Sequence, residues 1–218
     1  MKTREQIEGN EAKVHWNGKI ISVQPRIRLT RSFDQRSHNY LGYVLLLEGT
    51  IGEEARTFAI GIGKDAQAKH GFQVGSVVSG KSEKVQDSRS EVSEYYKTSE
   101  LKKVEQNVQQ EPSGPPWHGV PPTLEVYRER GHRRLDPRTY ETKCRTCIWG
   151  CRMPVEMIID QWNPRKKKYR FETFCYGPKS CQFYKAGPTR KVPGRKGMVW
   201  DEPDWIDEDA VSHRGMDE

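Results

Sequence analysis

The sequence predicts a mainly β protein, and three observations support that prediction. Residues 13–104 contain several short apolar stretches, some of them alternating with polar residues, which is typical of strands. All five cysteines lie between residues 144 and 181, in two groups separated by two further apolar stretches. Hydrophobic residues make up 33% of the chain and charged residues 31%, so we expect modest cores joined by long polar connections.

The first expected strand covers residues 13–31. In its second half, Ile27 and Leu29 alternate with Arg26 and Arg28, so the apolar and basic side chains point to opposite faces. We therefore expect the arginines near the end of this strand to lie on an exposed basic face.

A polar turn at residues 32–39 and four more strands follow. The strands are expected at residues 40–51, 57–62, 72–80 and 94–104, with a short polar helix at residues 63–71 between the third and the fourth. Three strands, a short helix and two more strands resemble the OB-fold, a small five-stranded Greek-key barrel. The resemblance covers residues 13–104 and rests on the order of the elements. It implies a nucleic-acid-binding domain.

Composition divides the chain into five segments. A short N-terminal extension precedes the OB-like barrel, and a proline-rich linker, a basic cysteine-rich module and an acidic tail follow it. The boundaries are residues 1–12, 13–104, 105–123, 124–200 and 201–218. The linker is assigned because proline disfavours the interior of both helices and sheets.

The net charge of +7 is distributed unevenly. Residues 126–200 hold 19 Lys and Arg against 6 Asp and Glu, whereas residues 201–218 hold 1 against 8. A basic block of this kind indicates a polyanionic partner, although a solvated lysine-rich face would have the same composition. We expect the tail to be mobile, or to fold back over the basic surface and compete with nucleic acid.

The cysteines are spaced as Cys144-x2-Cys147-x3-Cys151 and Cys175-x5-Cys181. Two residues between cysteines allow a tight turn that directs both sulfurs at one ion, and a distant second pair completes four ligands. The preferred zinc ligands are Cys144, Cys147, Cys175 and Cys181, with Cys151 spare or replacing Cys147. An iron–sulfur cluster and free buried thiols are the alternatives.

Between the two cysteine groups, residues 155–160 and 169–174 are expected to form two strands joined by a turn. This strand–turn–strand arrangement resembles the zinc ribbon, although the second cysteine pair is more widely spaced than usual. The resemblance implies a structural metal, because a small module with few aliphatic residues gains folding free energy from metal binding.

Basic and aromatic residues occur together in both segments, which suits phosphate neutralisation combined with base stacking. OB-folds commonly bind single strands across their second and third strands. The candidate contacts are Arg26, Arg28, Arg31, Arg36 and Tyr40 in the first segment, and Trp162, Arg165, Lys166, Lys167, Lys168 and Tyr169 in the expected hairpin.

Residues 75–82 match the phosphate-binding loop G-x4-G-K-[ST] letter for letter. The context argues against it, because no long buried strand precedes the match and no amphipathic helix follows it. An NTPase is therefore a remote alternative, and the six scattered histidines form no catalytic constellation.

We expect a non-enzymatic protein that binds single-stranded DNA or RNA through an OB-like barrel and a structural zinc module. The alternative is an adaptor that binds protein partners within a larger nucleic-acid-handling complex. No apolar stretch approaches the roughly 20 residues needed to span a membrane. No signal peptide is visible behind the N-terminal Met1, so a cytoplasmic protein is expected.

Overall fold

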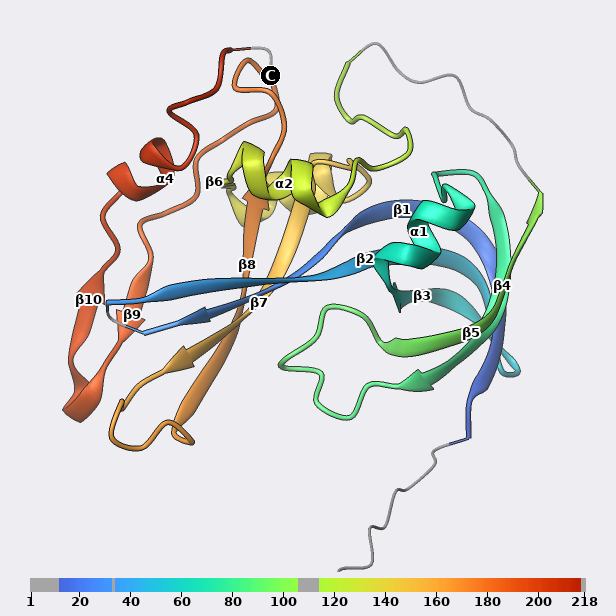
Figure 1. Ribbon diagram of the computed structural model, residues 1–218, viewed down its shortest axis with the longest axis horizontal. Helices are drawn as coiled ribbons and strands as arrows, with labels where there is room; N and C mark the ends of the chain where they lie inside the picture. The colour runs from blue at the N-terminus through green and yellow to red at the C-terminus, as the bar shows by residue number, and fades with distance from the viewer. Residues whose placement is uncertain (1–11, 33, 106–113, 217–218) are drawn as a thin grey trace, which may run out of the picture.

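The computed structural model describes residues 12–32, 34–105 and 114–216, and it is mainly β (Figure 1). Its first half is a ring of five strands in the order β1-β2-β3-β5-β4, closed by the pairing of β4 with β1. The elements are β1 (Val14–Arg31), β2 (Arg36–Ile51), β3 (Glu54–Ile62), α1 (Lys64–His70), β4 (Val77–Lys84) and β5 (Tyr95–Glu105). The expected order of three strands, a short helix and two more strands is confirmed.

The ring encloses an apolar core. Alternate residues of its strands point inward, and the side chains of Ile20, Leu45, Phe58, Ile60 and Val78 are fully buried. Full burial of side chains of this size contributes roughly 1.5–3 kcal/mol each. Burial of this apolar core is therefore a main source of the ring's stability.

Strands β1 and β2 are longer than a ring of this size needs, and their far ends leave it as a two-stranded ribbon (Figure 1). Their pairing continues to Arg31 opposite Arg36. The turn is therefore shorter than the expected residues 32–39, because β2 already begins at Arg36.

The ribbon joins the ring to the cysteine-rich segment. The end of β1 pairs in parallel with β7 (Gly150–Ile158), with Leu29 opposite Val155. Strand β7 pairs in turn with β8 (Lys167–Cys175), and β6 (Arg133–Arg134) completes a sheet of eight strands. One buried core cluster accordingly runs from the ring through Ile27 and Leu29 of β1 into β7 and β8.

The antiparallel β7–β8 hairpin confirms the strand–turn–strand arrangement expected between the two cysteine groups. Its register runs from Gly150 opposite Cys175 to Ile158 opposite Lys167. The strands begin earlier and end later than the apolar stretches at residues 155–160 and 169–174 indicate, because the pairing extends to the cysteines themselves.

Shorter elements cover this hairpin. They are α2 (Leu124–Arg130), α3 (Pro137–Thr139), the π-helical turn η1 (Tyr140–Cys144), β9 (Lys191–Pro193), the 3-10 turn η2 (Arg195–Gly197), β10 (Val199–Asp201) and α4 (Trp205–Asp209). Strands β9 and β10 form a second hairpin. The described part of the acidic tail thus has regular structure, with α4 near β6 (Figure 1).

Parts of the expected segments fall outside the described residues. These are residues 1–11 of the N-terminal extension, 106–113 of the linker and 217–218 of the tail. Within the described ranges, no helix is long and apolar enough to cross a bilayer.

The match to a phosphate-binding loop lies on a strand. Gly80, Lys81 and Ser82 belong to β4, where Lys81 forms an ion pair with Glu100 at 2.7 Å. A phosphate-binding loop requires its Lys and Ser at the start of a helix, where backbone N–H groups surround the anion. Residues 75–82 do not have that geometry.

Candidate metal centre and nucleic-acid interface

A tight turn brings Cys144 and Cys147 together. The π-helical turn η1 ends at Cys144, and the backbone N–H of Cys147 donates to the Cys144 carbonyl at 3.1 Å. The N–H of Gly150 donates in turn to the Cys147 carbonyl at 3.0 Å. A Cβ atom at position 150 would lie 2.5 Å from the Cys144 carbonyl oxygen, so this turn requires glycine there.

Strand pairing brings the second cysteine group to this turn. Cys175 ends β8 directly opposite Gly150. The wide gap between Cys175 and Cys181 is a loop held by Arg133, which donates to the Pro178 carbonyl at 2.8 Å and the Lys179 carbonyl at 3.3 Å. Arg133 also contacts Cys175, so one guanidinium joins the start of the loop to its middle.

Cys144 lies near the three other cysteines of the preferred set, Cys147, Cys175 and Cys181. Burial, together with the neighbouring Cys175, Cys147 and Cys181, raises the pKa of Cys144 to about 12. Burial also raises the pKa of Cys147, to about 11, opposed by hydrogen bonds from backbone groups of Trp149, Trp117 and Gly150. Amides directed at a sulfur in this way suit a thiolate that binds a metal.

Cys151 lies elsewhere. Its side chain is fully buried in the core that runs between the ring and the hairpin, and its thiol donates to the Pro25 carbonyl at 3.4 Å. Burial alone raises its pKa. The structure thus separates Cys151 from the set Cys144, Cys147, Cys175 and Cys181 that the spacing favours.

These thiols are neighbours without forming a closed coordination sphere. Across residues 12–32, 34–105 and 114–216, no three His, Cys, Asp or Glu side chains are close enough to hold a metal ion as they stand. The donor set is nevertheless chemically suitable, because four clustered thiols from a tight turn and a loop are the usual ligands of structural zinc.

Gln24 of β1 fastens the cysteine turn to the ribbon. Its amide nitrogen donates to the carbonyls of Cys144 and Cys147, both at 2.9 Å, and its oxygen accepts from the Tyr140 hydroxyl at 2.7 Å. All three bonds are buried. The neighbouring Ser22 hydroxyl donates to the Arg145 carbonyl at 2.8 Å, so two polar residues of β1 form hydrogen bonds to the same turn.

The arginines of β1 are paired, not free for phosphate. Arg26 and Arg28 both approach Glu91, at 3.0 and 3.9 Å, and thereby hold the β4–β5 connection against β1. The expectation that Arg31 is exposed with them is wrong. Its side chain is 1% exposed and contacts Glu172 at 3.4 Å and Glu202 at 3.2 Å.

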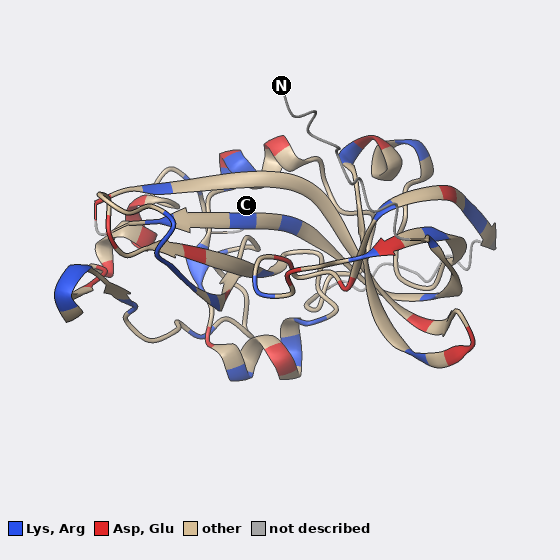
Figure 2. Cartoon of the chain, turned by 90° about the horizontal axis from the view of Figure 1, so that it is seen from below, with Lys and Arg blue, Asp and Glu red and all other residues tan. Residues whose placement is uncertain are grey.

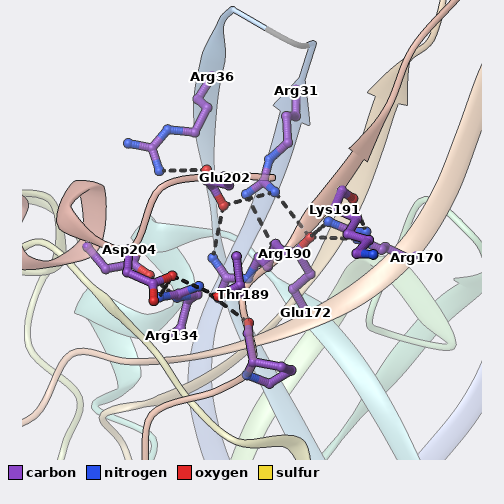
Figure 3. Close-up of polar contacts among 12 residues, drawn as sticks. Arg31, Arg36, Arg134, Arg170, Glu172, Thr189, Arg190, Lys191, Glu202 and Asp204 are labelled. Atoms are coloured by element: carbon purple, nitrogen blue, oxygen red, sulfur yellow. Dashed lines mark hydrogen bonds and ion pairs between the residues drawn. The ribbon is translucent and has the colours of Figure 1, made fainter. Parts of the chain in front are cut away.

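Arg31 belongs to a buried ionic cluster (Figure 3). Glu172 of β8 also binds Arg190 at 2.9 Å, and Glu202 also binds Arg36 at 3.2 Å. Burial lowers the pKa of Arg190 to about 10. Nearby, Arg134 binds Asp204 and Asp207, each at 2.5 Å. The acidic tail therefore neutralises arginines of the basic segment.

The remaining candidate of the first segment, Tyr40, is partly buried, with the guanidinium of Arg128 4.8 Å from its ring centre. The first-segment candidates thus divide between ion pairs, a buried cluster and a cation–π contact. They do not form one exposed groove.

The hairpin candidates are different, because most of them are open to solvent. Trp162 is 85% exposed at the tip of the β7–β8 hairpin, and Arg165, Lys166 and Lys168 are exposed beside it. Lys167 forms an ion pair with Glu156 at 2.6 Å. Tyr169 donates to Glu156 at 3.3 Å, with Arg89 4.9 Å from its ring centre.

Lys and Arg also cover the η2 turn at the left end of Figure 2.

Searches against protein-family models, curated proteins and solved structures find no match. The function must therefore be argued from the geometry of this chain alone.

Sequence patterns missed four residues that shape these sites: Gln24, Arg133, Gly150 and Trp200. Gly150 has a usable signal, because a glycine three residues beyond a Cys-x2-Cys pair suits a tight turn. Gln24 and Arg133 have none, since their partners are set by pairings between distant segments. Trp200 is the last residue of the basic segment by composition and lies on the β9–β10 hairpin in space.

Proposed function

We propose that this protein binds single-stranded nucleic acid through the tip of the β7–β8 hairpin. The observation that carries the proposal is the exposed Trp162 flanked by exposed Arg165, Lys166 and Lys168. A tryptophan ring that is open to solvent offers a stacking surface to an unpaired base, and the adjacent cations neutralise phosphates. The basic residues alone would suit solubility as well, and the combination with an exposed aromatic ring is what favours a base-stacking site.

Two further parts of the proposal concern the scaffold. The ring of five strands, with α1 between β3 and β4, is proposed to be an OB-like barrel. Cys144, Cys147, Cys175 and Cys181 are proposed to bind one structural Zn²⁺. The zinc would hold the base of the β7–β8 hairpin, because Cys175 ends β8 opposite the turn that contains the first pair. Metal binding would thereby fix the direction of the tip.

The test measures binding of fluorescein-labelled oligo(dT) and oligo(U) by anisotropy between 50 and 200 mM salt. Trp162→Ala should weaken binding about 5- to 150-fold, the range expected for losing one stacked base. Arg165→Glu with Lys166→Glu should weaken binding and also reduce its dependence on salt, since fewer counterions are then released.

Matched controls separate this site from general charge and aromatic content. Trp205→Ala removes a tryptophan that is 62% exposed on α4, and Lys64→Glu with Lys69→Glu makes the same charge change on exposed positions of α1. Both controls should bind nearly as the wild type does. If no single strand binds at low salt, the proposal fails, and capture of a protein partner that survives nuclease treatment would then favour an adaptor.

A further inference from the structure

The tips of two hairpins meet beside Trp162. Residues 158–162 at the end of β7 and residues 193–195 with Trp200 of the β9–β10 hairpin line one small pocket. Arg195 of η2 reaches Asp160 at 3.7 Å, which ties the second tip to the first. In Figure 1 the two tips lie together at the lower left, on the side away from the ring.

The pocket has a tryptophan from each hairpin. Trp162 is the exposed ring of the first tip, and Trp200 is half-buried on β10 opposite Val192 of β9. The ring of Trp200 lies directly on Gly194, where a Cβ atom would come within 1.6 Å of the ring. Only glycine at position 194 therefore allows Trp200 to hold this position against the wall of the pocket.

The surroundings of the pocket are basic. Arg165, Lys166 and Lys168 lie on the first tip, and Arg195 and Lys196 lie on the second, all of them exposed. Asp160 is the carboxylate among the lining residues, and it already pairs with Arg195 while accepting a hydrogen bond from the backbone N–H of Trp162 at 3.1 Å. The local charge thus favours an anionic ligand with an apolar, flat part.

We propose that the two tips form a clamp that takes one unpaired nucleobase between Trp162 and Trp200, with the flanking phosphates on the exposed cations of both tips. This inference rests on the proposed function and names its site. A base inside a duplex is already stacked on both faces, so only a single strand, a bulge or a strand end can supply the base. Duplex of the same length should therefore bind through its phosphates alone.

The contribution of the base can be isolated with synthetic strands. One oligonucleotide carries only abasic sugar-phosphate units, and a second carries a single central thymine in the same backbone. With the wild type, the thymine should tighten binding about 5- to 150-fold. With Trp200→Ala the thymine gain should shrink, because only Trp162 then stacks on the base, whereas Trp200→Phe, which keeps a stacking ring, should recover part of the gain.

The outcomes distinguish the clamp from the wider proposal. Thermal unfolding first establishes that Trp200→Ala is folded. If Trp162→Ala then weakens oligo(dT) binding while Trp200→Ala keeps the full thymine gain, the clamp is overturned. The single-strand binding function would still stand in that case. If the wild type binds neither strand, both are overturned. If Trp200→Ala is unfolded, Arg195→Glu decides instead. This exposed change breaks the ion pair with Asp160 that joins the two tips, so it should reduce the thymine gain, and a full gain would overturn the clamp.

Discussion

The side-chain amide of Gln24 donates a buried hydrogen bond of 2.9 Å to the carbonyl oxygen of Cys147. The same nitrogen bonds Cys144 at 2.9 Å, so one residue of the long β1 strand holds both ends of the cysteine turn. This contact links the ring to the proposed metal site more directly than the chain does, because 123 residues separate Gln24 from Cys147 in sequence.

Replacing Gln24 by Ala should therefore affect both stability and metal retention. The Tyr140 hydroxyl would lose its buried partner, which typically costs about 1–3 kcal/mol, and the carbonyls of Cys144 and Cys147 would keep only their backbone donors. Urea unfolding measures the first effect, and competition with a chelator measures the second. Tyr140→Phe is the matched control, since it removes a single bond and leaves the turn attached, so its effect should be the smaller one.

Substitution of the cysteines one at a time should identify the metal ligands. Cys144→Ser, Cys147→Ser, Cys175→Ser and Cys181→Ser should each lose bound zinc, because a tetrahedral structural site needs four protein ligands. Cys151→Ser should keep one zinc per chain, since the Cys151 thiol faces the Pro25 carbonyl in a separate core. Elemental analysis of purified protein measures the zinc, and it also reports iron. Loss of zinc in Cys151→Ser would contradict the proposed ligand set.

Glu202→Ala should destabilise the protein by about 3–5 kcal/mol, because it removes a buried partner of Arg31 and leaves Glu172 as the carboxylate that neutralises both Arg31 and Arg190. Glu202 pairs with Arg31 at 3.2 Å, and Arg31 is 1% exposed. The free energy of unfolding in urea measures the effect. Glu208→Ala is the control, as an exposed acidic residue of α4 in the same tail, and its effect should stay within about 0.5 kcal/mol. Equal effects of the two changes would show that the tail acts only through its net charge.

The position of Arg31 shows how far alternation along β1 could be used. Ile27 and Leu29 are fully buried, and Arg31 has the same parity, so the period of two directs it inward with them. Arg26 and Arg28 have the other parity and both reach Glu91. The alternation was therefore sufficient to place Arg31 on the buried face, apart from Arg26 and Arg28. The charge of Arg31 nevertheless suggested an exposed position, because its acidic partners lie far along the chain and could not be recognised from the sequence.

Local patterns predicted the ring strands, α1 and the hairpin, because each depends on apolar residues a few positions apart. The parallel pairing of β1 with β7 was not predictable, since it joins residues more than a hundred positions apart and leaves no periodic signal. The same reason hid Gln24 and Trp200. Their contacts depend on which surfaces meet, whereas the cysteine set was chosen from spacing alone and stays a prediction.

Acid should destabilise the protein through His38, which lies beside the ionic cluster. Burial lowers the pKa of His38 from 6.5 to about 4. The positive charges of Arg36, Arg31 and Arg190 lower it as well, whereas Glu172 raises it. The ring centre of His132 lies 4.8 Å from that of His38. Above pH 6.5 both folded and unfolded states are neutral at this residue. Between pH 6.5 and about 4 the unfolded state binds the proton first, so stability falls as the pH falls. His38→Gln should flatten this slope, measured as the free energy of urea unfolding at several pH values. An unchanged slope would mean that His38 is protonated equally in both states.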